Sequence, residues 1–168
     1  QLPVGGLETL KRLIASSTGI TVAGLTHVAM LPELEELDIA NCNVDLAELR
    51  KVALAKLKRL HIGSMKQKGD KSVQLLAGLQ SLEKLNITMC PNINFEDLPE
   101  KAFPALKQLY ARGAGITNAG LMQLAKLPNL ETLVVTGKTT TKGIQQFTAE
   151  LLRQGKRLIN VPNKFGSY

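Results

Sequence analysis

Leucine recurs along the chain in a fixed phrase of seven positions. The first, fourth and seventh positions are leucine or phenylalanine, and the positions between them are mostly polar. The copies of the phrase begin at Leu7, Leu31, Leu54, Leu79, Phe103 and Leu127. Successive copies start 23 to 25 residues apart, so the spacing predicts a chain built from six stacked repeats of about 24 residues.

The last leucine of each phrase predicts a short β-strand. In every copy an aliphatic residue or an alanine follows two positions later. Because successive side chains of a strand point to opposite faces, these two apolar residues share one face and their polar neighbours share the other. The strand leucines are Leu13, Leu37, Leu60, Leu85, Leu109 and Leu133.

Helix signals follow several of the strands. Repeats 1 and 5 continue with the near-copies GITVAGL and GITNAGL, in which Thr21 and Thr117 occupy positions typical of a helix N-cap. A capping box at Asp45–Glu48 predicts a helix that ends near Ala55. The longest helical pattern covers residues 141–154.

A strand, a turn and an outer segment that recur every 24 residues predict a right-handed α/β coil. Six to seven short strands form a parallel sheet on the concave side, and helices lie on the convex side, because no repeat can bury its own leucine face. We expect one domain over residues 1–168, closed by a helix, a strand at 157–161 and a short tail within 141–168. Residues 1–9 match only the tail of a repeat, so we expect the repeats to continue upstream of residue 1.

The repeats resemble the leucine-rich repeat superfamily over about residues 7–161. The consensus L-x-x-L-x-L-x-x-(N/C) is met in full where Cys42 and Cys90 occupy its last position. The phrase I-T-x-A-G-L is similar to the cysteine-containing type, which is best known in F-box substrate receptors and related adaptor and effector proteins. This resemblance implies a leucine-rich repeat solenoid that binds proteins. Four repeats depart from the consensus at that last position, with Thr18, Met65, Ala114 and Lys138.

Composition agrees with an aliphatic core. The chain has 168 residues, 44% hydrophobic residues, only 4% aromatic residues and no tryptophan. No apolar run approaches the roughly 18 residues that a membrane-spanning helix needs, so we expect no membrane partner. The net charge of +7 is striped, with −5 over residues 1–49, +7 over 50–71, −3 over 72–100 and +8 over 101–168. Such stripes favour a mixed interaction surface over a uniformly phosphate-binding one.

Nothing in the sequence indicates catalysis. The metalloprotease, P-loop, nucleophile-elbow and dinucleotide-binding motifs are absent, and the only histidines are His27 and His61. The sequence therefore predicts no enzyme, no cofactor, no metal site and no small-molecule substrate.

Cys42 and Cys90 are predicted to be structural. They share one repeat position and lie two repeats apart, which is roughly 10 Å at the usual strand spacing. A disulfide needs Cα atoms within about 7 Å, so we expect both thiols reduced and buried. Reduced thiols favour a reducing compartment, so we expect a cytoplasmic location, with the nucleus as the alternative.

The strand residues that point away from the core are the candidate partner-binding site. Tyrosine and arginine often anchor protein interfaces, and this face carries Tyr110 and Arg112. A protein partner is therefore the favoured hypothesis. The candidate residues on the concave face are Arg12, Asp38, Arg59, His61, Lys84, Asn86, Tyr110 and Arg112. The alternative is a nucleic-acid or ribonucleoprotein partner bound through the basic surfaces of residues 50–71 and 101–168, although the first of these lacks interleaved aromatic residues for base stacking.

One further pattern predicts a ladder of charge. The residue after the fourth position of each phrase alternates in sign without exception, and these residues fall on adjacent strands about 4.8 Å apart. We call this set the rim ladder: Lys11, Glu35, Lys58, Glu83, Lys107 and Glu131. We expect each lysine to lie between two glutamates.

Overall fold

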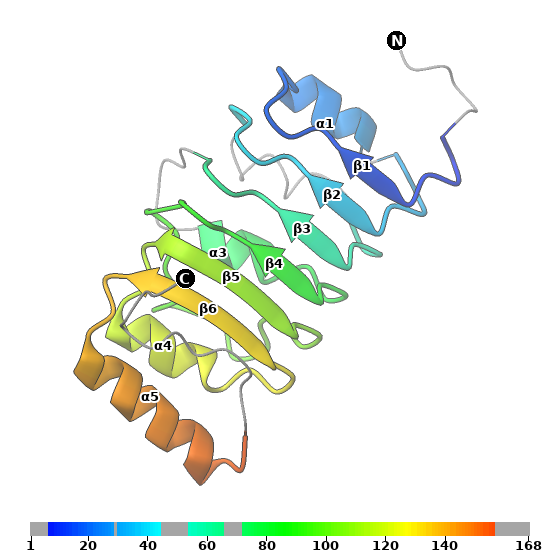
Figure 1. Cartoon of the computed structure of the whole chain (residues 1–168). Coiled ribbons are helices and arrows are strands. Elements are labelled where there is room, and N and C mark those ends of the chain that lie inside the picture. Colours follow the sequence, from blue (N-terminus) through cyan, green and yellow to red (C-terminus); the bar gives the residue numbers. More distant parts are fainter. Residues whose placement is uncertain (1–6, 29, 45–53, 66–71, 157–168) are drawn as a thin grey trace.

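Six short parallel strands form one sheet in chain order (Figure 1). The structure, a computed structural model, describes residues 7–28, 30–44, 54–65 and 72–156. The strands are β1 (Arg12–Ile14), β2 (Glu36–Asp38), β3 (Arg59–His61), β4 (Lys84–Asn86), β5 (Gln108–Ala114) and β6 (Thr132–Gly137). The helices within the described residues are α1 (Val22–Val28), α3 (Ser72–Leu76), α4 (Asn118–Leu124) and α5 (Thr141–Arg153).

The strand register follows the repeat. Each strand leucine pairs with the strand leucine of the next repeat, from Leu13 with Leu37 through to Leu109 with Leu133. The sheet therefore places equivalent residues of successive repeats side by side, as the constant spacing predicts. The helices lie on one side of the sheet and leave its other side open (Figure 1).

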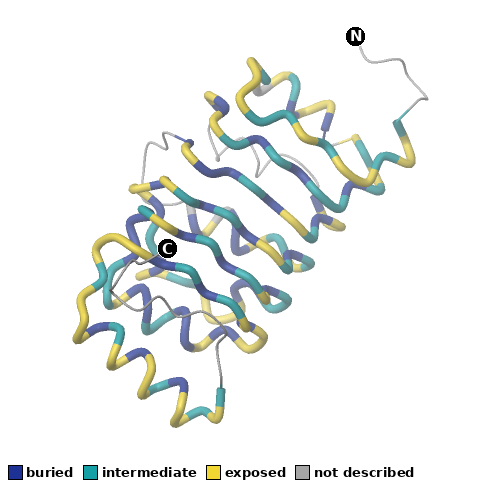
Figure 2. Tube along the Cα trace, in the orientation of Figure 1, coloured by how far each residue is buried: buried dark blue, intermediate teal, exposed yellow. Residues whose placement is uncertain are grey.

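The core lies between the sheet and the convex side of the coil. Leu37, Leu85, Leu109 and Leu133 have no exposed surface, and the residues beside them along the strands are partly or fully exposed (Figure 2). This inside–outside alternation is the one that the sequence predicts. Three phenylalanines fill the wider space under the C-terminal half of the sheet: Phe95, Phe103 and Phe147.

Both cysteines are free and buried, as predicted. The Cys42 thiol donates to the carbonyl of Ala15 at 3.1 Å, and the Cys90 thiol donates to the carbonyl of Ile62 at 3.2 Å. Each acceptor belongs to the preceding repeat, so each thiol satisfies a backbone group where two repeats meet. Burial raises the pKa of the Cys90 thiol above its usual value.

The helix starts agree with the sequence where they are described. The hydroxyl of Thr117 accepts from the backbone N–H of Gly120, and Thr140 caps α5 one residue before its predicted start. Helix α3 was not predicted, because the sequence analysis found no helix signal in residues 72–76. Most of the helix predicted at 45–55, the strand predicted at 157–161 and the tail after it lie outside the described residues.

A left-handed turn residue recurs in every repeat: it follows β1–β4, lies inside β5 and ends β6, and the sequence pattern did not reveal it. The residue four positions after the strand leucine has a positive φ in all six repeats. These residues are Ser17, Asn41, Ser64, Met89, Gly113 and Gly137. Four of the six have a side chain, although a residue with a Cβ atom is strained there. The turn therefore arises from the stacking of the repeats and not from local glycine preference.

We expect Leu85→Ala to lower the free energy of unfolding by about 2–5 kcal/mol, because Leu85 is fully buried in the central strand β4. Urea denaturation followed by circular dichroism measures this change. Leu152→Ala removes the same atoms from a side chain that is 69% exposed, and it should cost far less. A loss below about 0.5 kcal/mol for Leu85→Ala would contradict the strand register.

We also expect Met89→Gly to be more stable than Met89→Ala by about 1 kcal/mol. Both changes remove the same exposed side chain, but only glycine relieves the strain at a φ of 60°. Chemical denaturation of the two variants measures the difference. Equal stability would show that the turn at residue 89 does not hold this conformation in solution.

Candidate functional site

The sheet face that the helices leave open carries the predicted partner-binding residues. We call it the open sheet face, and it consists of the residues one before, one after and three after each strand leucine. The eight candidates lie on it: Arg12, Asp38, Arg59, His61, Lys84, Asn86, Tyr110 and Arg112. The structure thus brings together on one surface residues that are up to 100 positions apart in the chain.

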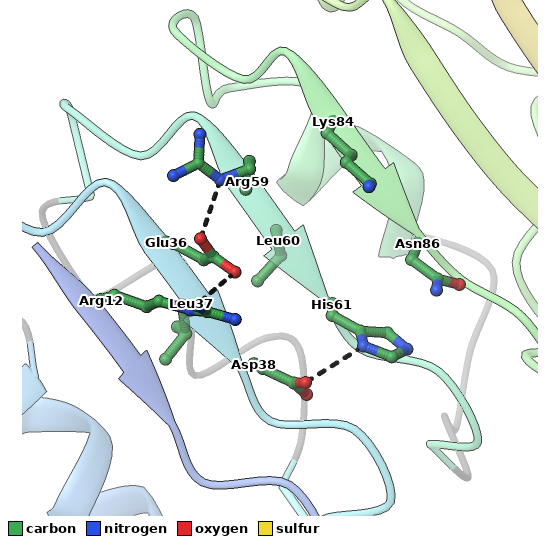
Figure 3. Close-up of a pocket in the computed structure, with 9 residues that line it drawn as sticks. All are labelled: Arg12, Glu36, Leu37, Asp38, Arg59, Leu60, His61, Lys84 and Asn86. Carbon is green, nitrogen blue, oxygen red and sulfur yellow. Dashed lines mark hydrogen bonds and ion pairs between the residues drawn. The ribbon is translucent and has the colours of Figure 1, made fainter.

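Strand β2 is acidic and lies between two basic strands. The carboxylate of Glu36 forms two ion pairs (Figure 3). One oxygen lies 3.1 Å from Nε of Arg12, and the other lies 2.9 Å from Nε of Arg59. The carboxylate of Glu36 is therefore shared by the strands on both sides. Sequence reasoning missed this bridge, although the alternating signs of Arg12, Glu36 and Arg59 carry the same signal as the rim ladder.

Asp38 and Asn86 also hold the backbone that follows their strands. The side-chain oxygen of Asp38 accepts from the N–H of Ala40 at 3.0 Å, and that of Asn86 accepts from the N–H of Thr88 at 3.0 Å. The second oxygen of Asp38 lies 3.2 Å from Nδ1 of His61. These two residues stabilise the turns after β2 and β4, so part of their hydrogen-bonding capacity is already used.

An open hollow of about 260 Å³ lies over β1–β4. It is lined by the bridge of Glu36 with Arg12 and Arg59, by Asp38 and by Lys84, among others (Figure 3). Within this hollow the two carboxylates are engaged by cationic or imidazole groups of neighbouring strands. A ligand would have to displace those ion pairs, so this half of the face is largely self-neutralised.

The other half of the open sheet face, over β4–β6, has a different charge. Its face positions hold Lys84 and Arg112 but no aspartate or glutamate. The Nζ atom of Lys84 lies 5.1 Å from the ring centroid of Tyr110, which is a cation–π contact between adjacent strands. This half therefore presents positive charge next to a half-buried aromatic ring.

The members of the rim ladder lie side by side in the order that the sequence predicts. Glu35 accepts from Lys58 at 3.0 Å and lies 3.7 Å from Lys11, and Glu83 accepts from Lys107 at 3.1 Å. The backbone places each member beside the next, since the N–H of Glu83 donates to the carbonyl of Lys58. Lys58 therefore lies between Glu35 and Glu83 along the sheet, as expected. Within the described residues its ammonium group forms an ion pair with Glu35.

The contact between Lys58 and Glu35 alters the protonation equilibrium of the Glu35 carboxyl group. The hydrogen bond from Lys58, together with the charge of that residue, holds the pKa of Glu35 below its usual value. The contribution of this carboxylate to stability is present at neutral pH and is lost as the pH falls through the lowered pKa.

In the basic stretch of residues 50–71, the described basic side chains pair with acidic side chains of repeat 2. Within residues 54–65, every basic side chain pairs with an acidic one of that repeat. The pairs are Lys56 with Glu33, Lys58 with Glu35, Arg59 with Glu36 and His61 with Asp38. Residues 50–53 and 66–71 of the same basic stretch lie outside the described part of the chain.

The described residues hold neither a cluster of metal ligands nor a membrane-spanning helix. They contain no group of three or more histidine, cysteine, aspartate or glutamate side chains that could hold a metal ion. None of their helices is both long and apolar enough to cross a bilayer.

Comparison with known proteins gives relatives for both the sequence and the fold. No protein-family model matches the chain. Human tubulin-specific chaperone E is 32% identical over 157 residues, which cover 88% of this chain and 30% of that protein. The bovine protein of the same name is 30% identical over 149 residues, covering 84% of this chain and 28% of its own length. The chain thus spans about 30% of the length of these curated relatives.

A solved structure settles the architecture. The crystal structure of an internalin (inlF) from Listeria monocytogenes superposes with a TM-score of 0.59 over 89% of this chain and 40% of that chain, at 21% identity. The fold is a leucine-rich repeat solenoid. At this identity the likeness concerns the fold alone. The solenoid predicted from the leucine phrase is therefore confirmed.

We expect Glu83→Lys to destabilise the solenoid more than Glu83→Gln by about 0.5–1 kcal/mol at low salt. The lysine would lie beside Lys58 and Lys107 on the rim ladder, so like charges would meet on adjacent strands. Urea denaturation at about 0.02 M and about 0.5 M NaCl measures the difference, which should shrink as salt screens the charges.

The control is Glu8→Lys, which makes the same charge change at an exposed residue outside the rim ladder. An equal cost at both positions would point to net charge alone and would contradict a local ladder.

Proposed function

We propose that this solenoid is a non-catalytic protein-interaction module that binds a protein partner through the open sheet face. The contact is the half over β4–β6, where Lys84 lies over Tyr110 and no carboxylate is present on the face. That cation–π pair is the observation that carries the proposal. It offers an aromatic anchor and an ammonium group that already face solvent in one fixed arrangement.

The charge of this half indicates the chemistry of the partner. An acidic segment would meet Lys84 beside Tyr110, on a half of the face whose positions hold no aspartate or glutamate. The half over β1–β3 offers no such advantage, because Glu36 and Asp38 already hold its cationic and imidazole groups. We therefore propose that Lys84, Tyr110 and Arg112 contact the partner. Asn86 lies at the border of that contact. The remaining candidates stabilise the sheet face: Arg12, Asp38, Arg59 and His61.

The names of the relatives suggest a first partner to test. They are tubulin-specific chaperones, and this chain matches 30% of the human protein's length. We propose that the solenoid recognises tubulin or a folding intermediate of it, in the manner of an adaptor or substrate-recruiting receptor. Such a role requires no active site in this segment.

Three finer assignments complete the proposal. The equivalent positions and contacts of Cys42 and Cys90 support repeats of the cysteine-containing type. The continuous register of the sheet supports a single domain over residues 1–168. Free, buried thiols suit a cytoplasmic protein.

We expect Tyr110→Ala to weaken binding of purified tubulin at least tenfold, because the change removes the aromatic anchor and the surface under Lys84. Lys84→Glu should weaken it as much or more by reversing the charge of the patch. Biolayer interferometry with immobilised solenoid measures both affinities, and circular dichroism checks that the variants remain folded.

Lys142→Glu is the matched control, since it makes the same charge reversal at an exposed residue of α5, away from the open sheet face. An equal loss in this variant would contradict a defined contact over β4–β6. Binding to generic RNA that falls steeply with salt, together with no binding to tubulin, would favour the nucleic-acid alternative.

A further inference from the structure

Met89 is the exception among the residues that adopt the left-handed conformation. The residue four positions after the strand leucine is serine, asparagine or glycine in the other five repeats and methionine only in repeat 4. Glycine has no Cβ atom to clash at a positive φ, and short polar side chains can hydrogen-bond to the nearby backbone. Methionine has neither property, although its φ is 60°. The local backbone therefore gives no reason for a methionine at this position.

The side chain of Met89 is also exposed. It is 61% exposed, whereas Met65 in the preceding repeat is buried. A single exposed apolar side chain is common on protein surfaces, but this one lies on a strained backbone as well. Strained residues of this kind gather at binding sites, where the strain is offset elsewhere in the fold. The two costs at one residue point to a role in binding.

Strand β5 makes room for this side chain with a β-bulge. Gly113 is the extra residue of the bulge, because the residues on either side of it pair with consecutive residues of β6. A Cβ atom on Gly113, whose φ is 65°, would lie 2.8 Å from Sδ of Met89. Any side chain at Gly113 would therefore displace the thioether. Bulges are frequent beside functional sites, where they change the direction of a side chain.

The exposed methionine is continuous with the proposed contact. The N–H of Met89 donates to the carbonyl of Arg112 at 2.7 Å, so Met89 lies at the carboxyl end of the open sheet face over β4–β6. Gly113 follows Tyr110 by three residues on β5, a rise of about 10 Å. The ammonium group of Lys84 lies over the ring, and the thioether lies over the glycine. A cationic anchor and an apolar anchor are thus separated by about that distance along β5.

We infer that Met89 is the apolar anchor of the partner contact, and that the partner presents an extended segment with an acidic and an apolar side chain on one side. The acidic side chain meets Lys84. The apolar one packs on the thioether, which is flexible enough to follow its shape. In an extended chain, side chains two and four positions apart point to the same side at about 7 and 13 Å, which bracket the separation of the anchors. The inference rests on the proposed function, since it names the partner chemistry of the same face.

Three synthetic peptides test the inference. GSESESLSG places leucine two and four positions after its glutamates. GSESELSSG has the same composition, but its leucine points to the opposite side of an extended chain, and GSESESSSG lacks the leucine. NMR titration of the chain with isotope-labelled methionine methyl groups measures each affinity. The first peptide should bind about fivefold more tightly than the other two, and it alone should shift the methyl signal of Met89.

Met89→Ser is the deciding variant, because serine already occupies this turn position in repeats 1 and 3. It should remove the fivefold preference, so that all three peptides bind as the peptide without leucine does. Met30→Ser is the matched control, since Met30 is 76% exposed and lies outside the open sheet face, and this variant should keep the preference. Lys84→Glu should weaken binding of all three peptides. Circular dichroism checks that each variant is folded.

Equal affinities for the three peptides overturn the inference, and so does a preference that survives Met89→Ser. Unchanged binding in Lys84→Glu overturns the acidic half of it. If no peptide binds, the inference is overturned, and binding of purified tubulin then decides separately whether the proposed function stands. A preference that depends on Met89, without any binding of tubulin, supports the inference and removes tubulin as the partner.

Discussion

Each repeat of this solenoid carries a strand leucine that it cannot bury alone, and the rest of the structure follows from that constraint. Leu37, Leu85 and Leu109 are fully buried because a neighbouring repeat lies on each side of their strands. The same stacking fixes the parallel register and sets a left-handed residue four positions after every strand leucine. It also brings a buried thiol to the carbonyl of the preceding repeat at Cys42 and Cys90.

Stacking at a constant register converts a pattern in the sequence into a pattern on the surface. Equivalent residues of successive repeats lie on adjacent strands, so alternation of sign along the chain becomes attraction across the sheet. Glu35 and Glu36 of repeat 2 each lie between basic residues of repeats 1 and 3. Each exposed pair contributes little stability by itself. Together they pair acidic side chains of repeat 2 with basic side chains of repeats 1 and 3.

This pairing of charges divides the open sheet face into two halves that differ in how readily they could bind a charged partner. Over β1–β3 the carboxylates are held by neighbouring side chains, so a partner would have to replace existing contacts. Over β4–β6 there is no carboxylate on the face, and Lys84 rests on Tyr110. A partner with an acidic segment gains electrostatic attraction to Lys84 there.

The sequence alone determined the repeat length, the strand leucines, the parallel stack, the buried thiols and the position of the eight candidate residues on one face. It could do so because each depends on a single spacing that recurs six times. It did not determine which partner Lys58 selects, the bridge that Glu36 forms with Arg12 and Arg59, or the pairing of Lys84 with Tyr110. Those depend on side-chain reach across strands, which a one-dimensional pattern does not contain.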